Sequence, residues 1–436
     1  NWSQVRILCD PPFIRHNVFM KSKDLFLASF LFFLVLSSWY VMRAVRNELA
    51  VENYSDDFLI ILLSCTALVM LLINPIYSWI ASRSNFKKIV IYCYSFLIIN
   101  LFVFLFYSSS LTAEDTGRLS YRSLFYQKVW LGRIFYVWAN IYSFFVVSIF
   151  WVLIINLYRN YKSRRFYGFI MAGGSVGAIF GSELAIRLSE SFVNNGLELF
   201  VLTSSILLLL AMLLAIYIFN TRASVNSISK VGGTALDPIK NIITKSEIRL
   251  IATYSWLFTL LMTIQWICAI PIVEAYSDLS PERIELFGRI EQLVSPLTLI
   301  SQVFLTYFVI SFIGIRSILI IYGALFVVVF LLYGFYPSVG VVVISQAILR
   351  VFEYAFNKPS REIVYSGLEK NDRYKSSVFI DTFLTRFGDL TGSIYIGIGK
   401  FLGIGIGLMP ILSIPIAGIL SLVGIKIFNK EKFKDL

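Results

Sequence analysis

Long apolar segments recur along the whole chain, and they constrain its fold more than any other feature. Each is close to the ~20 residues that an α-helix needs to cross the ~30 Å hydrocarbon core of a bilayer. Of the 436 residues, 58% are hydrophobic and only 15% are charged, which is more apolar surface than a water-soluble domain can bury. The sequence therefore predicts an all-α polytopic membrane protein with twelve transmembrane helices. The predicted spans are residues 25–42, 58–81, 89–107, 129–155, 166–188, 199–219, 250–275, 290–312, 317–336, 339–356, 378–401 and 405–428.

A hydrophilic stretch divides these spans six and six. This plan resembles that of major facilitator transporters, whose two halves are related by an axis along the membrane normal. We therefore expect two six-helix bundles that form one pseudo-symmetric unit. The expected parts are an N-terminal tail at 1–24, an N-terminal bundle at 25–219, a linker at 220–249, a C-terminal bundle at 250–428 and a C-terminal tail at 429–436.

Lysine and arginine are unevenly distributed between alternate loops. Sorting the loops alternately from the N-terminal tail places 26 of the 38 basic residues on one side and nine on the other, with three inside spans. Cytoplasmic loops carry the basic excess in membrane proteins, so both tails and the linker are expected in the cytoplasm. The net charge of +12 has the same explanation, and we expect no nucleic acid as a partner.

Two arginines, Arg43 and Arg46, follow the first apolar segment. Residues three apart lie on one face of a helix, so the two charges are expected side by side. They could simply reach the headgroups from the end of the helix. However, acidic residues follow them, at Glu48 and Glu52, so a cytoplasmic anchor does not explain the pair. We interpret Arg43 and Arg46 as part of a site for an anion.

Further charged and polar residues fall within predicted spans. Charges at such depth usually face a cavity or one another. Arg133 and Asn140 share one face of the fourth span and are candidates for substrate contact. Arg133 must find a partner on another helix or a ligand because it has no acid within a turn.

Two basic residues, Arg350 and Arg386, have an acid three residues later, at Glu353 and Asp389. An ion pair within one helix is the simplest interpretation of both. The alternative is that the arginines contact an anionic substrate. In that case Glu353, Asp389 and the nearby Asp381 are candidates for coupling or gating.

Glycines are spaced four apart in the fifth span, at Gly173, Gly177 and Gly181. Such a strip lets a neighbouring helix approach closely, so these glycines are expected to pack against another span. Glycines of the eleventh span, the equivalent position in the second half, include Gly388 and Gly392, which is consistent with internal symmetry.

Histidine and cysteine are scarce. The one histidine lies in the N-terminal tail, and Cys9, Cys65, Cys93 and Cys268 show no paired spacing. We expect free thiols, buried for the three in spans, with no disulfide, no metal site and no cofactor. The scarcity also argues against a membrane-embedded enzyme, and no stretch is long enough for the soluble signalling domain of a sensor.

Four stretches, in order, carry a family resemblance. They are RAVRNEL from Arg43, YVWAN ending at Asn140 with VSIFW after it, RFY from Arg165, and the segment from PSRE at 359–362 to Gly388. They resemble the ATP/ADP translocase family, the nucleotide transporters of plastids and intracellular bacteria, including shorter relatives in free-living bacteria. The resemblance implies a major-facilitator-like fold, a bacterial inner (plasma) membrane location and exchange of nucleotides. It implies that Arg46 contacts the substrate and that Arg43 supports it.

The chain departs from this family at two positions. Asn140 replaces a glutamate, and Asp389 replaces a lysine, which lowers the local positive charge at that position by two. A polyanion needs concentrated positive charge, so these departures favour another polar metabolite, such as a carboxylate, a siderophore or a drug-like compound. The sequence thus predicts a monomeric secondary active transporter for a small anionic solute, with ATP and ADP among the candidates. The absence of a phosphate-binding loop motif excludes ATP hydrolysis of the P-loop type as the energy source.

Overall fold

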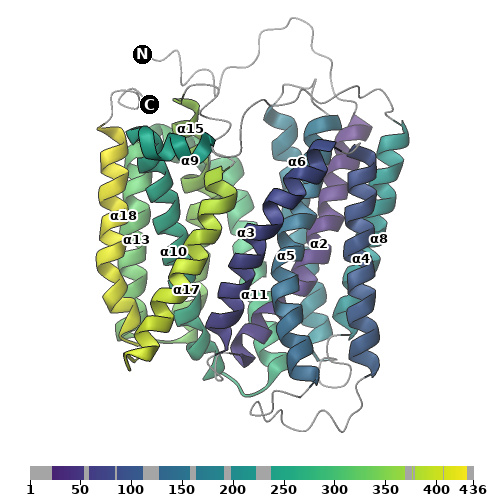
Figure 1. Cartoon of the computed structure of the whole chain (residues 1–436), viewed down its shortest axis with the longest axis horizontal. Coiled ribbons are helices and arrows are strands. Elements are labelled where there is room, and N and C mark those ends of the chain that lie inside the picture. The colour runs from purple at the N-terminus through teal and green to yellow at the C-terminus, as the bar shows by residue number, and fades with distance from the viewer. Residues whose placement is uncertain are drawn as a thin grey trace, which may run out of the picture.

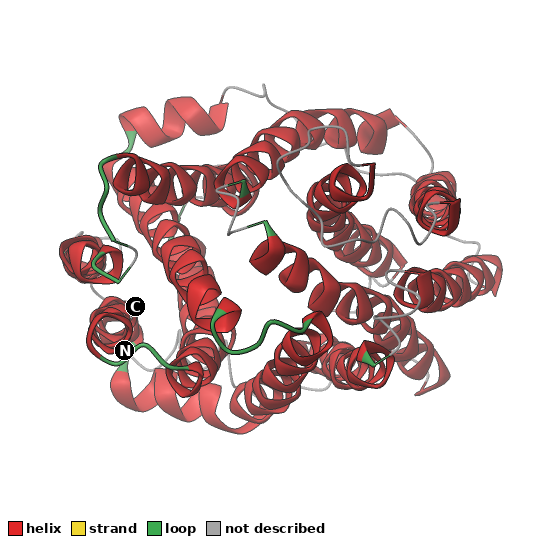
Figure 2. Cartoon of the chain, turned by 90° about the horizontal axis from the view of Figure 1, so that it is seen from below, coloured by secondary structure: helices red, strands yellow, loops and turns green. Residues whose placement is uncertain are grey.

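The computed structural model describes residues 22–53, 58–83, 86–110, 127–157, 164–190, 198–221, 237–368, 376, 379–405 and 407–429. The regular structure of these residues is helical (Figures 1 and 2). We call the helices α2 to α8 the N-terminal half and those from α9 onward the C-terminal half. The N-terminal half contains α2 (Ser22–Glu52), α3 (Leu59–Arg83), α4 (Phe86–Ser110), α5 (Gln127–Leu157), α6 (Arg164–Ser189) and α8 (Glu198–Thr221).

The C-terminal half is less regular, because π-helical turns (η) interrupt two of its long helices and a third such turn leads into α17. Its elements are α9 (Asp237–Thr244), α10 (Ser246–Glu274), α11 (Ser280–Ile300), η2 (Ser301–Leu305), α12 (Thr306–Ile313), α13 (Ile315–Phe335), α14 (Val339–Phe352), η3 (Glu353–Asn357), α15 (Lys358–Ser366), η4 (Ile380–Leu384), α17 (Thr385–Phe401) and α18 (Met409–Phe428).

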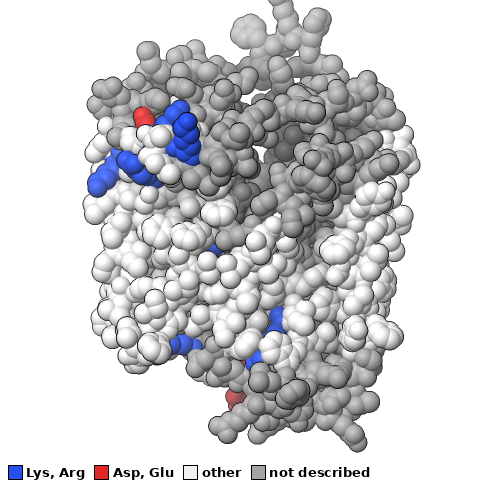
Figure 3. Space-filling view, viewed as in Figure 1, with Lys and Arg blue, Asp and Glu red and all other residues white. Residues whose placement is uncertain are grey.

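Ten helices of the described residues are long and apolar enough to cross a membrane. The two other predicted spans coincide with α3, whose apolar part is Leu59–Met70, and with η4 and α17. The all-α, multi-pass prediction is therefore confirmed, whereas the number of twelve crossings and the domain limits stay predictions. In the space-filling view, the described residues around the middle of the molecule are almost all uncharged, as a surface facing lipid requires (Figure 3).

The two halves lie side by side in Figure 1, with α2, α4, α5, α6 and α8 on the right and α10, α13, α17 and α18 on the left. Contacts between the halves come mainly from α11, which packs against α2 and α6, and from α17, which packs against α3. A site between these helices would therefore be built from both halves.

The glycines of α6 lie against α2. A Cβ added at Gly173, Gly177 or Gly181 would overlap the backbone of α2 at Ser29, Phe33 and Ser37. The hydroxyl of Ser37 also donates to the carbonyl oxygen of Gly177 at 3.1 Å. The absence of side chains on this strip thus allows direct backbone contact between the two helices.

The C-terminal half repeats this arrangement with α17 and α10. A Cβ at Gly388 would overlap Thr259 and the carbonyl oxygen of Trp256, and one at Gly392 would press on the carbonyl oxygen of Leu260. The first and fifth spans of each half are therefore packed in the same way, which is the internal symmetry that the glycine pattern indicated.

The structure corrects two expectations about the spans. The first helix continues to Glu52, well past its predicted end at residue 42, and α11 begins at Ser280, before its predicted start at 290. In both cases the added segment carries buried charges that pair with the other segment, Glu48 of α2 with Arg283 of α11. The three described cysteines are free, as expected, but only Cys268 is buried, while Cys65 is exposed.

Candidate functional site

A cavity of about 190 Å³ lies between the two halves. α2 forms its wall from the N-terminal half, and α10, α11, α14 and η3 form the rest. Three of its residues are arginines and one is a glutamate, so the lining carries an excess of two positive charges. The lining residues are Arg43, Arg46, Asn47, Met262, Gln265, Trp266, Phe287, Ile290, Glu291, Val342, Gln346, Arg350 and Tyr354.

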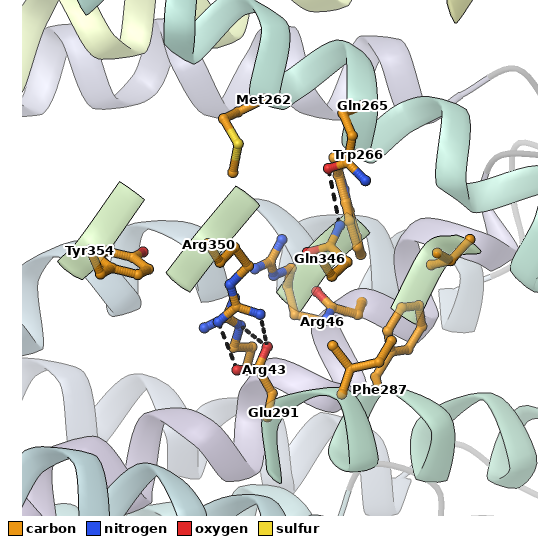
Figure 4. A pocket seen from close by; sticks show the side chains of 13 residues that line it. Arg43, Arg46, Met262, Gln265, Trp266, Phe287, Glu291, Gln346, Arg350 and Tyr354 are labelled. Atoms are coloured by element: carbon orange, nitrogen blue, oxygen red, sulfur yellow. Dashed lines mark hydrogen bonds and ion pairs between the residues drawn. The ribbon is translucent and has the colours of Figure 1, made fainter. Parts of the chain in front are cut away.

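Arg43 and Arg46 reach this cavity from the last turns of α2. Their spacing places both on the helix face that the C-terminal half covers, while Ala44 and Val45 are buried in the N-terminal half. The structure thus brings Arg43, Arg46 and Arg350 together from distant parts of the sequence (Figure 4).

Glu291 is the acidic partner in this cluster. Arg350 forms a bidentate pair with it, with Nη1 2.6 Å from Oε1 and Nη2 2.8 Å from Oε2. Arg43 approaches the same Oε1 with its Nε at 3.1 Å. One carboxylate is therefore shared by guanidinium groups from the two halves, as Figure 4 shows.

Arg46 lies between aromatic rings. Its guanidinium carbon is 5.8 Å from the ring centre of Trp39 and 6.0 Å from that of Trp266. Its Nε, the side-chain oxygen of Asn47 and the indole N–H of Trp266 are buried and have no hydrogen-bond partner among the described residues. Leaving such groups unpaired costs about 1 to 3 kcal/mol each, so their convergence at one cavity indicates a place for a polar ligand.

The opposite wall is a hydrogen-bonded chain of neutral side chains. Gln346 donates to Gln265 at 3.2 Å, and Gln265 donates to the hydroxyl of Tyr333 at 2.7 Å. Tyr333 in turn contacts the hydroxyl of Ser345 at 2.9 Å. This chain fixes the two amides, which present polar groups to the cavity without adding charge.

A second ion pair between the halves lies nearer the end of α2. The carboxylate of Glu48 accepts hydrogen bonds from Arg283 of α11, with Nε 2.9 Å from each oxygen and a closer contact from Nη2. Glu48 is fully buried, and Arg283 also donates to the carbonyl oxygen of Ser277 at 2.8 Å. The halves are thus joined by a buried pair beside the cavity.

Arg386 and Asp389 form the ion pair that their spacing predicted, with Nη1 2.8 Å from Oδ2. Asp389 also accepts from Thr263 at 3.0 Å, and the guanidinium of Arg386 lies 5.9 Å from the ring centre of Phe144 on α5. The amide of Asn140 donates to the carbonyl oxygen of Tyr136 on its own helix. None of Arg386, Asp389 and Asn140 is among the residues that line the described cavity.

Arg133 finds a partner outside its own helix, which is one of the two outcomes that the sequence predicted. Its Nε donates to the side-chain oxygen of Asn53 at 3.0 Å, and its guanidinium lies over the ring of Phe58, 3.6 Å from the ring centre. It therefore ties the end of α2 to the segment that leads into α3, away from the lining of the cavity.

The predicted pair of Arg350 with Glu353 is wrong, because each residue has a partner on another part of the fold. Glu353 binds Arg361, with Oε1 2.7 Å from Nη2, and also accepts from Asn357. Arg361 lies 3.6 Å from Asp381, which accepts from Tyr365. Glu353 and Asp381 thus belong to a polar network inside the C-terminal half.

Glu291 and Arg283 were not predicted as site residues. Arg283 precedes the predicted span at 290–312 and Glu291 lies at its start, so the predicted spans leave Arg283 in a loop. The signal was present, because Ile284, Phe287, Ile290 and Val294 follow helical spacing through the charges, and all four are buried.

No protein-family model matches the sequence, and no curated protein matches it either. Among solved structures, two of the nucleoside transporter NupG are similar to this chain. One, of a point mutant, has a TM-score of 0.59 at 14% identity and covers 93% of this chain and 99% of NupG. The other has the same TM-score and identity and covers 94% and 99%. The identity is low, so the similarity establishes the fold alone: this chain has the helical fold of these transporters.

Proposed function

We propose that this protein is a secondary active transporter that moves a small anionic solute across the membrane by alternating access. The observation that carries the proposal is the cavity between the two halves, where three arginines face one glutamate. Basic side chains in the middle of a membrane protein are costly unless they meet a partner or a ligand. A lining with two positive charges in excess favours an anion over a neutral or cationic solute.

The arrangement of the ion pairs supports alternating access. The pairs of Glu48 with Arg283 and of Glu291 with Arg43 both connect α2 to α11, that is, one half to the other. Transporters of this fold expose a central site by rocking one half against the other, so contacts of this kind must break and form in each cycle. The close backbone contact of α2 with α6 keeps the N-terminal half rigid during this motion.

Within this function we propose nucleotides, with ATP and ADP exchange first, as one substrate class. Support comes from the family resemblance at Arg43 and Arg46 and from the aromatic rings of Trp39, Trp266 and Phe287 beside the arginines. Such rings can stack on a base while the arginines bind phosphate. The two similar structures are of a nucleoside transporter, and a nucleoside carries a base as a nucleotide does.

A small carboxylate is the second candidate, and the size of the cavity favours it. The volume of about 190 Å³ is below the ~300 Å³ at which pockets for drug-sized ligands begin. The bidentate geometry of Arg350 on Glu291 is also the geometry that suits a carboxylate.

Uptake into proteoliposomes tests the function. Labelled ATP is offered to vesicles preloaded with ADP or with buffer, and labelled adenosine and succinate are offered in parallel. Nucleotide exchange is supported if ATP uptake needs internal ADP and is lost in Arg46→Ala. Succinate uptake alone supports the carboxylate alternative. Uptake of adenosine with neither anion would overturn the anionic assignment.

A further inference from the structure

Glu291 is held in a manner unusual for a structural ion pair. Its side chain is 4% exposed, and it contacts guanidinium groups that belong to opposite halves. Arg350, 7% exposed, engages both oxygens, and Arg43 engages one of them again. The carboxylate of Glu291 therefore lies between two arginines that come from different halves of the protein.

The contacts leave this cluster positively charged. A single carboxylate neutralises one of the three guanidinium groups of Arg43, Arg46 and Arg350. Among the described residues, Glu291 is the only acid that lines the cavity. A second oxyanion would therefore meet attraction from all three arginines and repulsion from Glu291 alone.

We propose that Glu291 is an internal stand-in for the anionic group of the solute, which takes the place of its carboxylate between Arg43 and Arg350. The inference rests on the proposed transport of anions, and it names the group that the site recognises: a carboxylate or phosphate oxyanion that can accept from two guanidinium groups. In the empty site Glu291 keeps the two arginines from repelling each other. The bound solute then performs that role itself.

The surroundings of Glu291 allow its carboxylate to move aside. The cavity borders it directly, so the carboxylate has open space on that side. On the next residue, Gln292 donates to Glu183 of α6 at 2.6 Å. That side-chain bond holds α11 against α6, so a turn of the Glu291 side chain does not require the helix to move.

Chemical rescue tests this role without requiring a known solute. The thermal unfolding midpoint of the full-length protein in detergent is measured for wild type and for Glu291→Ala with increasing sodium acetate or sodium phosphate. Sodium chloride at equal ionic strength controls for screening. Glu285→Ala, which removes an exposed acid paired with Arg289 on the same helix, is the matched control.

We expect Glu291→Ala to unfold at a lower temperature than wild type and to regain several degrees, in a saturable manner, with acetate, phosphate or both. Rescue by acetate alone assigns carboxylate solutes, and rescue by phosphate alone assigns phosphate-bearing ones. Wild type and Glu285→Ala should respond equally to each salt and less than Glu291→Ala, because in both of them the anion must displace the Glu291 carboxylate. Equal responses to all three salts, or none, would overturn the role of Glu291.

A second variant covers the case in which Glu291→Ala does not fold. Glu291→Gln keeps the shape of the side chain and the two unneutralised arginines, so the same anions should raise its unfolding midpoint. The double variant Arg43→Gln/Glu291→Gln should lose that response, because one of the two arginines proposed to bind the anion is gone. A response that survives in the double variant contradicts the proposal.

Uptake by wild type distinguishes the proposed transport function from the proposed role of Glu291. Rescue by acetate or phosphate without transport of any anion would leave the oxyanion site in place and remove the proposed function. Transport of anions without rescue would keep the function and overturn the stand-in role of Glu291.

Discussion

Glu48 of α2 and Arg283 of α11 form a buried ion pair that joins the two halves of the molecule, with both carboxylate oxygens 2.9 Å from the guanidinium Nε. Glu48 directly follows Arg46 and Asn47, which line the cavity, so the pair lies beside the cavity toward the end of α2. The predicted topology places this side away from the cytoplasm. Under the proposed alternating access, this ion pair would open whenever the site faces that side.

Replacing one partner of this pair should destabilise the closed arrangement. Glu48→Gln leaves a buried guanidinium without its counter-charge, which typically costs about 3 to 5 kcal/mol. We expect a lower thermal unfolding midpoint, and recovery of most of the loss in the exchange variant Glu48→Arg/Arg283→Glu. The exposed neighbour Glu282→Gln serves as the control and should behave as wild type. An unfolding midpoint unchanged by Glu48→Gln would show that the pair does not hold the halves together.

Adding side-chain volume to the glycine strip should separate α6 from α2. The added atoms of Gly177→Val meet the backbone of Phe33, which cannot move without displacing the helix. We expect a loss of about 2 kcal/mol or more in stability, the scale of overpacking in a dense core, seen as reduced yield and a lower unfolding midpoint. Gly418→Ala is the matched helical control, since its Cβ would meet open space. Equal behaviour of the two variants would contradict the packing role.

Removing a positive charge from the cavity should weaken anion binding. For Arg46→Ala we expect roughly a tenfold or greater rise in the solute concentration for half-maximal uptake, about 1.4 kcal/mol or more, because a charge-assisted hydrogen bond is lost. Arg46→Lys should recover part of the loss, since it keeps the charge but not the planar donor group. Arg289→Ala, at an exposed position on α11, should leave uptake unchanged. An unaltered uptake curve for Arg46→Ala would remove this arginine from the site.

Replacing Glu353 should lower the stability of the protein and leave the ion coupling of transport unchanged. Both of its oxygens are engaged, one by Arg361 and the other by Asn357, inside the C-terminal half. Glu353→Gln should lower the unfolding midpoint because Arg361 loses its closest counter-charge. The pH dependence of uptake, measured on the folded variant, should match wild type. A changed pH profile would restore Glu353 as a candidate for coupling.

Sequence patterns were sufficient to predict the helical fold, because a bilayer permits few kinds of backbone structure. The length and spacing of apolar segments predicted the helices, and the glycines at intervals of four predicted the close contact of α6 with another span. The arginine pair of α2 was also correctly placed at a shared face, since Arg43 and Arg46 both line the cavity.

The partners of these charges could not be predicted, because they depend on which helices meet. Helical spacing favours Glu353 as the partner of Arg350, with substrate contact as the alternative, whereas tertiary packing pairs it with Glu291, 59 residues away. Arg133 shares a helix with Asn140, but the fold places it beside Asn53. Local spacing predicts which residues share a face, and only the arrangement of the helices determines what that face meets.

The three π-helical turns of the described residues, η2, η3 and η4, all lie in the C-terminal half. Such a turn arises when a single extra residue enters an α-helix, and it rotates everything beyond it by about 100°. The two halves therefore differ in residue register even where their helices correspond. A comparison of the halves without gaps at Ser301–Leu305, Glu353–Asn357 and Ile380–Leu384 would align the wrong faces, and an ancestral duplication would be invisible in the sequence.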